Sequence, residues 1–208
     1  MKRSSRLAVA AASLLLLAVY VTPLWRIRLI APQYPEGLGL QIWVNQITGL
    51  KPNDLNNING LNHYIGMRAI DPGSFPELEY MPKLLGAAVV AGLLVALIGR
   101  RPLLYVWAVL ITLGAAAGLG DFYKWGYDYG HKLDPHAAIK VPGMSYQPPV
   151  IGSKQLLNFH ATSWPGVGGW IAIAALAIVV TVAVLEWRRV RAPEAVRSGP
   201  VRAAEATA

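Results

Sequence analysis

The sequence predicts an all-α integral membrane protein with four transmembrane helices and two partly ordered extracytoplasmic loops. Three observations support this class: a mean hydropathy of +0.40, four long stretches without Asp, Glu, Lys, Arg or His, and an uneven charge distribution between the connecting segments. A bilayer core about 30 Å thick needs roughly 20 apolar helical residues. The uncharged stretches are residues 7–25, 84–98, 102–120 and 164–185.

The first stretch follows a basic N-terminus, so a cleavable signal peptide is the alternative to a membrane anchor. Its apolar run is longer than the core of a typical signal peptide. It also ends at Val21-Thr-Pro-Leu-Trp25, which contains no small-x-small cleavage site. We therefore expect residues 7–25 to remain as the first transmembrane helix.

The second stretch is too short unless its helix begins near Met81, with Lys83 extending its ammonium group towards the outer headgroups. The turn Arg100-Arg101-Pro102 then joins this helix to the third as an antiparallel hairpin. We expect a membrane domain over residues 1–187, with helices at about 7–25, 81–98, 102–120 and 164–186. The Ala-, Arg- and Pro-rich tail, 188–208, has the composition of a disordered segment.

The charge distribution predicts the orientation, because short cytoplasmic segments carry an excess of Lys and Arg. With both termini inside, the cytoplasmic segments hold ten cations and three anions, a net charge of +7. The two outer loops, together with Lys83 at the outer end of the second helix, hold nine cations and eight anions, a net charge of +1. We therefore expect a multi-pass protein of the bacterial inner membrane with cytoplasmic N- and C-termini. The high pI fits anionic lipid headgroups, and no nucleic-acid partner is indicated.

The outer loops span residues 26–80 and 121–163, and loops of this length are rarely structureless. In the first loop, residues 38–44 alternate apolar side chains with other residues, which predicts a short strand. Asp54 is placed to cap a short helix that ends near Gly66. In the second loop, the aromatic residues of 121–129 suit the membrane interface, and 141–149 has the Pro and Gly content of a turn or an extended strap.

Several function classes are excluded or made unlikely by what the chain lacks. It contains no cysteine, which excludes disulfides, thiolate metal sites and covalently attached c-type haem. The four uncharged stretches also contain no histidine. A membrane-embedded b-type haem and a buried proton pathway are therefore not expected. No catalytic motif is specific enough to propose an enzyme. An enzymatic function therefore ranks a distant third, after the two functions described below. The helices are therefore expected to serve as scaffold and anchor.

All four histidines and three of the four methionines lie in the outer loops. If residues 59–67 are helical, His63 and Met67 lie four residues apart on one face. Imidazole and thioether ligands together suit copper, with the thioether favouring Cu(I). The alternative is a hydrogen-bonded loop histidine beside a core methionine. The candidate metal ligands are His63, Met67, His131, His136, His160 and Met144.

Three loop segments resemble a family of small bacterial membrane proteins associated with gene clusters for nitrous oxide reductase, a periplasmic copper enzyme of denitrification. They are Ala31-Pro-Gln-Tyr-Pro-Glu-Gly-Leu-Gly39, Leu61-Asn-His-Tyr-Ile-Gly-Met67 and Lys140-Val-Pro-Gly-Met-Ser-Tyr-Gln-Pro-Pro149. The resemblance covers most of residues 1–187 and implies an accessory role in copper handling, assembly or electron supply. It implies no catalytic residues.

Two hypotheses follow. In the first, the chain is a copper-binding or copper-delivering accessory protein that acts through His63 and Met67. In the second, it is a metal-free structural membrane subunit or assembly factor that docks a partner through its aromatic and Pro-rich outer loops. The partners in either case are the lipid bilayer and a periplasmic copper enzyme or other membrane subunits.

Overall fold

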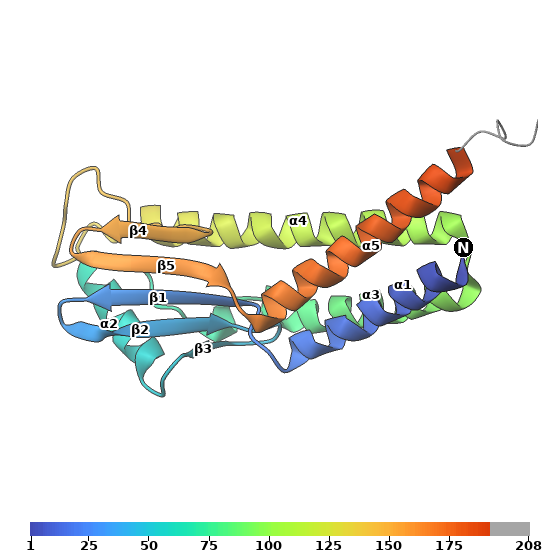
Figure 1. The fold of residues 1–208 in the computed structure, drawn as a ribbon. Coiled ribbons are helices and arrows are strands. Elements are labelled where there is room, and N and C mark those ends of the chain that lie inside the picture. The colour runs from blue at the N-terminus through green and yellow to red at the C-terminus, as the bar shows by residue number, and fades with distance from the viewer. Residues whose placement is uncertain (192–208) are drawn as a thin grey trace, which may run out of the picture.

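The computed structural model describes residues 1–191, and the tail predicted to be disordered lies outside this range from residue 192 onwards. The chain divides into a long helical bundle and a smaller head built around a β-sheet (Figure 1). The helices are α1 (Arg3–Leu15), α2 (Asp54–Ile65), α3 (Glu77–Ile98), α4 (Arg101–His131) and α5 (Val167–Arg191), with short 3₁₀ helices η1 (Leu16–Tyr20) and η2 (Pro72–Ser74). The strands are β1 (Trp25–Ala31), β2 (Tyr34–Ile42), β3 (Ile47–Gly49), β4 (Gly152–Leu156) and β5 (Phe159–Pro165).

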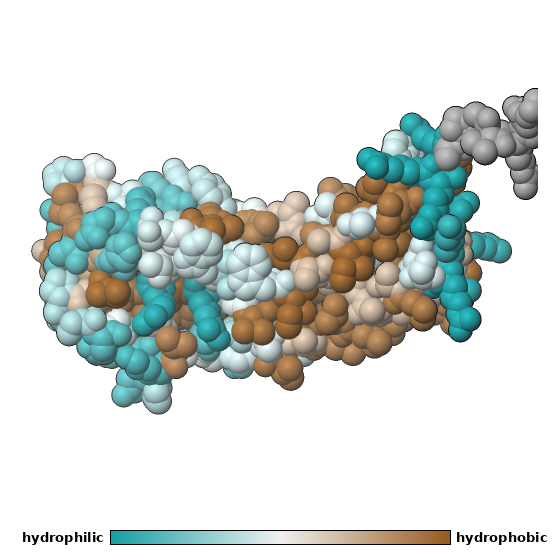
Figure 2. All heavy atoms as spheres, viewed as in Figure 1, coloured by the Kyte–Doolittle hydropathy of each residue, from teal (hydrophilic) through white to brown (hydrophobic). Residues whose placement is uncertain are grey.

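Four helical segments are long and apolar enough to cross a membrane: α1 with η1, α3, α4 and α5. Their apolar surfaces form a continuous band, with hydrophilic residues collected at the two ends of the molecule (Figure 2). This distribution is the one expected of a multi-pass membrane protein, because lipid replaces water around the middle of the bundle.

Small residues bring three of the membrane helices into close contact. Val9 and Ala12 of α1 are fully buried, and Gly92 of α3 lies directly against Ser13 and Trp107. A side chain at Gly92 would overlap both neighbours, so glycine is required for this approach. The small-residue run on α4 differs, since a Cβ at Gly114 or Gly118 would meet no atom of the described chain.

The all-α prediction is wrong, because the two outer loops together form a five-stranded antiparallel sheet in the order β3-β2-β1-β5-β4. Its central pair joins distant parts of the sequence, with Trp25 opposite Pro165 and Ile27 opposite Ser163. Because β1 follows η1 after four residues and β5 precedes α5 by one, both central strands continue directly from membrane helices. The predicted strand at 38–44 therefore belongs to a sheet that the sequence did not reveal.

Two helices complete the head on the inner side of the sheet. The third membrane helix was expected to end at residue 120, but α4 continues to His131 and carries the aromatic segment into the head. Helix α2 begins at Asp54 and ends before Gly66, whose φ of +79° requires glycine. Asp54 is not the N-cap. Its buried carboxylate instead accepts hydrogen bonds from the backbone N–H groups of Gly39 (2.8 Å) and Lys51 (3.1 Å), which fixes α2 to the sheet.

Candidate functional site

The end of α2 is packed against the segment that follows α4, so the two outer loops meet in the head. The backbone N–H of Asp134 donates to the carbonyl oxygen of Gly66 at 2.8 Å, and that of Ile139 donates to Tyr64 at 2.9 Å. Gly66 allows this approach because a Cβ there would lie 2.9 Å from Ala137. Candidate ligands from both loops are thereby brought to one side of the head.

A surface recess of about 430 Å³ lies at this junction and is lined in part by His63, Met67 and Asp134. His63 is exposed and contacts Tyr64 edge-on, with ring centroids 6.1 Å apart. Met67 is half-buried and also packs against the apolar core of the head. The cations Arg68 and Lys132 line the same recess, so the local charge is mixed.

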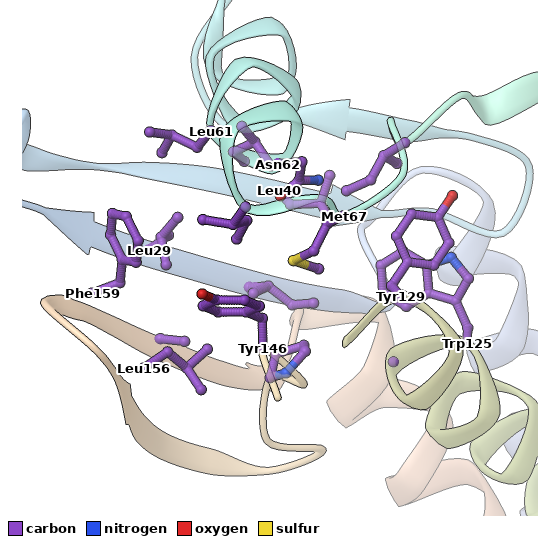
Figure 3. Close-up of a pocket in the computed structure, with 17 residues that line it drawn as sticks. Leu29, Leu40, Leu61, Asn62, Met67, Trp125, Tyr129, Tyr146, Leu156 and Phe159 are labelled. Carbon is purple, nitrogen blue, oxygen red and sulfur yellow. The ribbon is translucent and has the colours of Figure 1, made fainter. Parts of the chain in front are cut away.

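The other candidate ligands lie outside this recess. His131 stacks on Tyr127 at a centroid distance of 4.0 Å, and its Nδ1 lies 3.0 Å from the Tyr127 carbonyl oxygen. His136 is exposed, His160 lies on β5, and Met144 is half-buried in the 141–149 strap. Within residues 1–191, no three His, Cys, Asp or Glu side chains are grouped closely enough to hold a metal. The recess therefore offers one imidazole and one carboxylate, whereas the Met67 thioether points away from it, towards Tyr146 (Figure 3).

The outer face of the sheet presents a row of basic and polar side chains. Arg26 and Arg28 are exposed on β1, opposite Trp164 and Thr162 of β5, and the next outward pair is Ile30 with His160. Neither arginine forms an ion pair or a side-chain hydrogen bond with any described residue. We call Arg26, Arg28 and His160 the outer basic face.

The inner face of the sheet covers a cavity of about 90 Å³ between β1, α2 and the end of α4. Its lining is almost entirely apolar, and Met67 and Tyr146 approach one another across it (Figure 3). Tyr146 is held there by the strap, because its backbone N–H donates to Gly130 of α4 at 3.0 Å. The strap lies so close to α4 that a Cβ at Gly130 would overlap the backbone of Gln147.

Sequence reasoning missed both the outer basic face and the polar residues of the cavity. The alternation of Trp25-Arg-Ile-Arg-Leu29 is a strand signal that identifies Arg26 and Arg28 as neighbours on one face. Trp125 was assigned to the membrane interface because it lies in an aromatic segment. No local signal places Tyr146 next to the sheet, since its position depends on the strap crossing α4.

Comparison with protein-family models and with curated proteins finds no match to this sequence.

Proposed function

We propose that the chain is a membrane-anchored accessory protein that docks an acidic extracytoplasmic partner on its outer basic face. The observation that carries this proposal is the exposed pair Arg26 and Arg28, neither of which has a carboxylate partner in the described structure. Unpaired guanidinium groups on a fixed surface favour carboxylates, with which arginine forms bidentate hydrogen bonds. The difference between +7 and +1 in net charge predicts that both termini are cytoplasmic, and the head then faces the extracytoplasmic side, where such a partner would lie.

The rigidity of the platform supports the same function. The two strands that carry the outer basic face are the strands continuous with α1 and α5. A partner that binds to this face would be held at a fixed height above the membrane, which we propose is the bacterial inner membrane. Pre-positioned side chains lose less conformational entropy on binding than side chains on a mobile loop.

The resemblance of the loops makes nitrous oxide reductase the first partner to test. Binding of the purified enzyme to the protein in nanodiscs is measured for the parent and for Arg26→Glu/Arg28→Glu. The control, Lys83→Glu/Lys140→Glu, carries the same change in net charge at exposed positions away from the sheet. We expect the arginine variant to bind at least tenfold more weakly, which corresponds to about 1.4 kcal/mol, and the control to bind like the parent.

Equal binding by the arginine variant and the parent would overturn docking through the outer basic face. Failure of the parent to bind would overturn the assignment of nitrous oxide reductase as partner.

Copper handling is a second candidate function, and the recess lined by His63, Met67 and Asp134 favours it. It requires the flexible Met67 side chain to turn its thioether from the inner cavity to the recess. Imidazole and thioether donors suit Cu(I), and a partner protein would supply a further ligand for tight binding. A Cu(I)-chelator competition assay tests this role with His63→Ala, Met67→Leu and, as control, His160→Ala on the sheet. We expect the first two substitutions to weaken Cu(I) binding and the control to leave it unchanged. If the parent protein binds no copper in this assay, copper handling is contradicted as a function.

A further inference from the structure

The inner cavity contains two buried polar groups that find no hydrogen-bond partner among the described residues. They are the hydroxyl of Tyr146, a residue only 3% exposed, and the indole Nε1 of Trp125. Tyr129, which also lines the cavity, differs because its hydroxyl donates to the carbonyl oxygen of Ala69 at 3.2 Å. A buried polar group without a partner is destabilising, so two such groups in one cavity call for an explanation.

Ordered water is a poor explanation for the Tyr146 hydroxyl. In Figure 3 this hydroxyl lies on the side of the cavity formed by Leu29, Leu156 and Phe159, all of which are apolar. Buried water is held by two to four polar partners, and this part of the cavity supplies only one. An occupant with an apolar body and a single polar atom fits the lining better.

The chemistry of the Tyr146 hydroxyl defines that polar atom. A phenolic hydroxyl donates readily, so an acceptor oxygen satisfies it. The indole N–H of Trp125 lies on the opposite side of the cavity, beside Tyr129, and the same oxygen does not reach it (Figure 3). The remaining lining consists mainly of Leu, Ile, Phe and Met side chains, which favour hydrocarbon. A cavity of about 150 Å³ accommodates benzene, which has six non-hydrogen atoms, so about 90 Å³ suits a ligand of roughly four non-hydrogen atoms.

We propose that the inner cavity binds a small apolar molecule with a carbonyl oxygen, which accepts a hydrogen bond from Tyr146. The site is separate from the outer basic face, because it lies on the inner face of the sheet, away from Arg26 and Arg28, and it shares only Met67 with the recess of the copper candidate. The strap positions the hydroxyl, and the indole of Trp125 reports on occupancy because it lines the same cavity.

The test uses the full chain in nanodiscs and two probes of equal size, acetone and isobutene, at matched free concentrations. The second probe replaces the carbonyl oxygen with a CH₂ group. Binding is followed through the Trp125 indole N–H resonance, which is assigned with Trp125→Phe. The variants are Tyr146→Phe and, as control, Tyr105→Phe, which removes the other buried unpartnered tyrosine hydroxyl, in the membrane bundle.

We expect acetone to shift the Trp125 resonance saturably, with about fivefold weaker binding to Tyr146→Phe and unchanged binding to Tyr105→Phe. Isobutene should bind the parent and Tyr146→Phe equally. The proposal is overturned if acetone gives no saturable shift, or if the loss of the Tyr146 hydroxyl leaves the affinity for acetone unchanged.

Discussion

The basic end of the membrane bundle and the inner cavity of the head differ in how their buried polar groups are partnered. At the basic end, the carboxylate of Glu186 is fully buried and accepts hydrogen bonds from Ser5, Arg101, Arg189 and the backbone of Lys2. At the inner cavity, Tyr146 and Trp125 have buried polar atoms that find no partner within residues 1–191. Each region also contains the other kind of group, since the Asp54 carboxylate in the head is hydrogen-bonded and the Tyr105 hydroxyl in the bundle finds no described partner.

This difference separates the roles of the two regions. A fully satisfied buried carboxylate fixes the mutual position of helices, which is what a membrane anchor requires. Unsatisfied groups around a cavity lower stability and are retained where something else binds them. This contrast fits the proposed division between an anchoring bundle and a head that binds a partner or ligand, and variants in each region should respond differently.

The largest effect is expected at Glu186, whose carboxylate joins α1, α4 and α5. Glu186→Ala removes the acceptor for Ser5, Arg101 and Arg189 and leaves a cavity in the packed helix end. Breaking a buried ion pair costs about 3 to 5 kcal/mol, and the partly exposed arginines place this site near the lower value. The free energy of unfolding in mixed micelles measures the loss. A change below 1 kcal/mol would show that the bundle does not depend on this carboxylate.

A smaller loss is expected where the strap crosses α4 in the head. Gly130→Ala forces a Cβ into the backbone of Gln147, and overpacking of this kind costs about 1 to 3 kcal/mol. Gly60→Ala in α2 is the matched control, because a Cβ there meets no atom and alanine favours helix. The same unfolding experiment should show destabilisation for the first variant and no loss for the second. Equal stability of the two variants would contradict the strap packing.

Removal of the Tyr146 hydroxyl should cost nothing in the absence of ligand. Tyr146→Phe deletes an unsatisfied buried group while it preserves the ring, so the free energy of unfolding should stay equal or rise by up to about 1 kcal/mol. Tyr129→Phe is the comparison, since it loses the hydrogen bond to Ala69 and should be destabilised by about 1 kcal/mol. If Tyr146→Phe is the more damaging of the two, its hydroxyl has a structural partner.

The smallest effect is expected for an exposed ion pair at the start of α3. Glu79 and Lys83 are 2.9 Å apart, but both side chains are more than two-thirds exposed. Glu79→Gln should therefore change the free energy of unfolding by about 0.5 kcal/mol or less. A loss comparable to that of Glu186→Ala would remove the distinction between buried and exposed carboxylates.

The sequence predicted the spans well because absence of charge over about 20 residues is a local property. It missed the sheet because the pairing of β1 with β5 is non-local, and because Trp25 closes an apolar run that was assigned entirely to a helix. It also ended the third membrane helix at Gly120, where the apolar run stops but the α-helix does not. Hydropathy marks the edge of the bilayer, and the end of a helix depends on backbone contacts beyond it.

The candidate site was less predictable for the same reason. The four-residue spacing of His63 and Met67 was visible in the sequence, and both residues border one recess, but the Met67 thioether points into the inner cavity. Tyr146 was visible only as part of a Pro- and Gly-rich strap. Its burial depends on contact with Gly130 of α4, which is well separated from it in the sequence. No local sequence pattern encodes that contact.

Accessibility of single cysteines tests most directly whether the head is presented outside the membrane while the basic end lies in the cytoplasm. The chain contains no cysteine, so each label reports on one position. Ser153 on β4 and Ser4 at the start of α1 are both exposed, and they lie at opposite ends of the molecule. In cells treated with a membrane-impermeant maleimide, Ser153→Cys should be labelled, and Ser4→Cys should be labelled only after the membrane that holds the protein is permeabilised. Labelling of Ser4→Cys but not Ser153→Cys in intact cells would contradict an extracytoplasmic head.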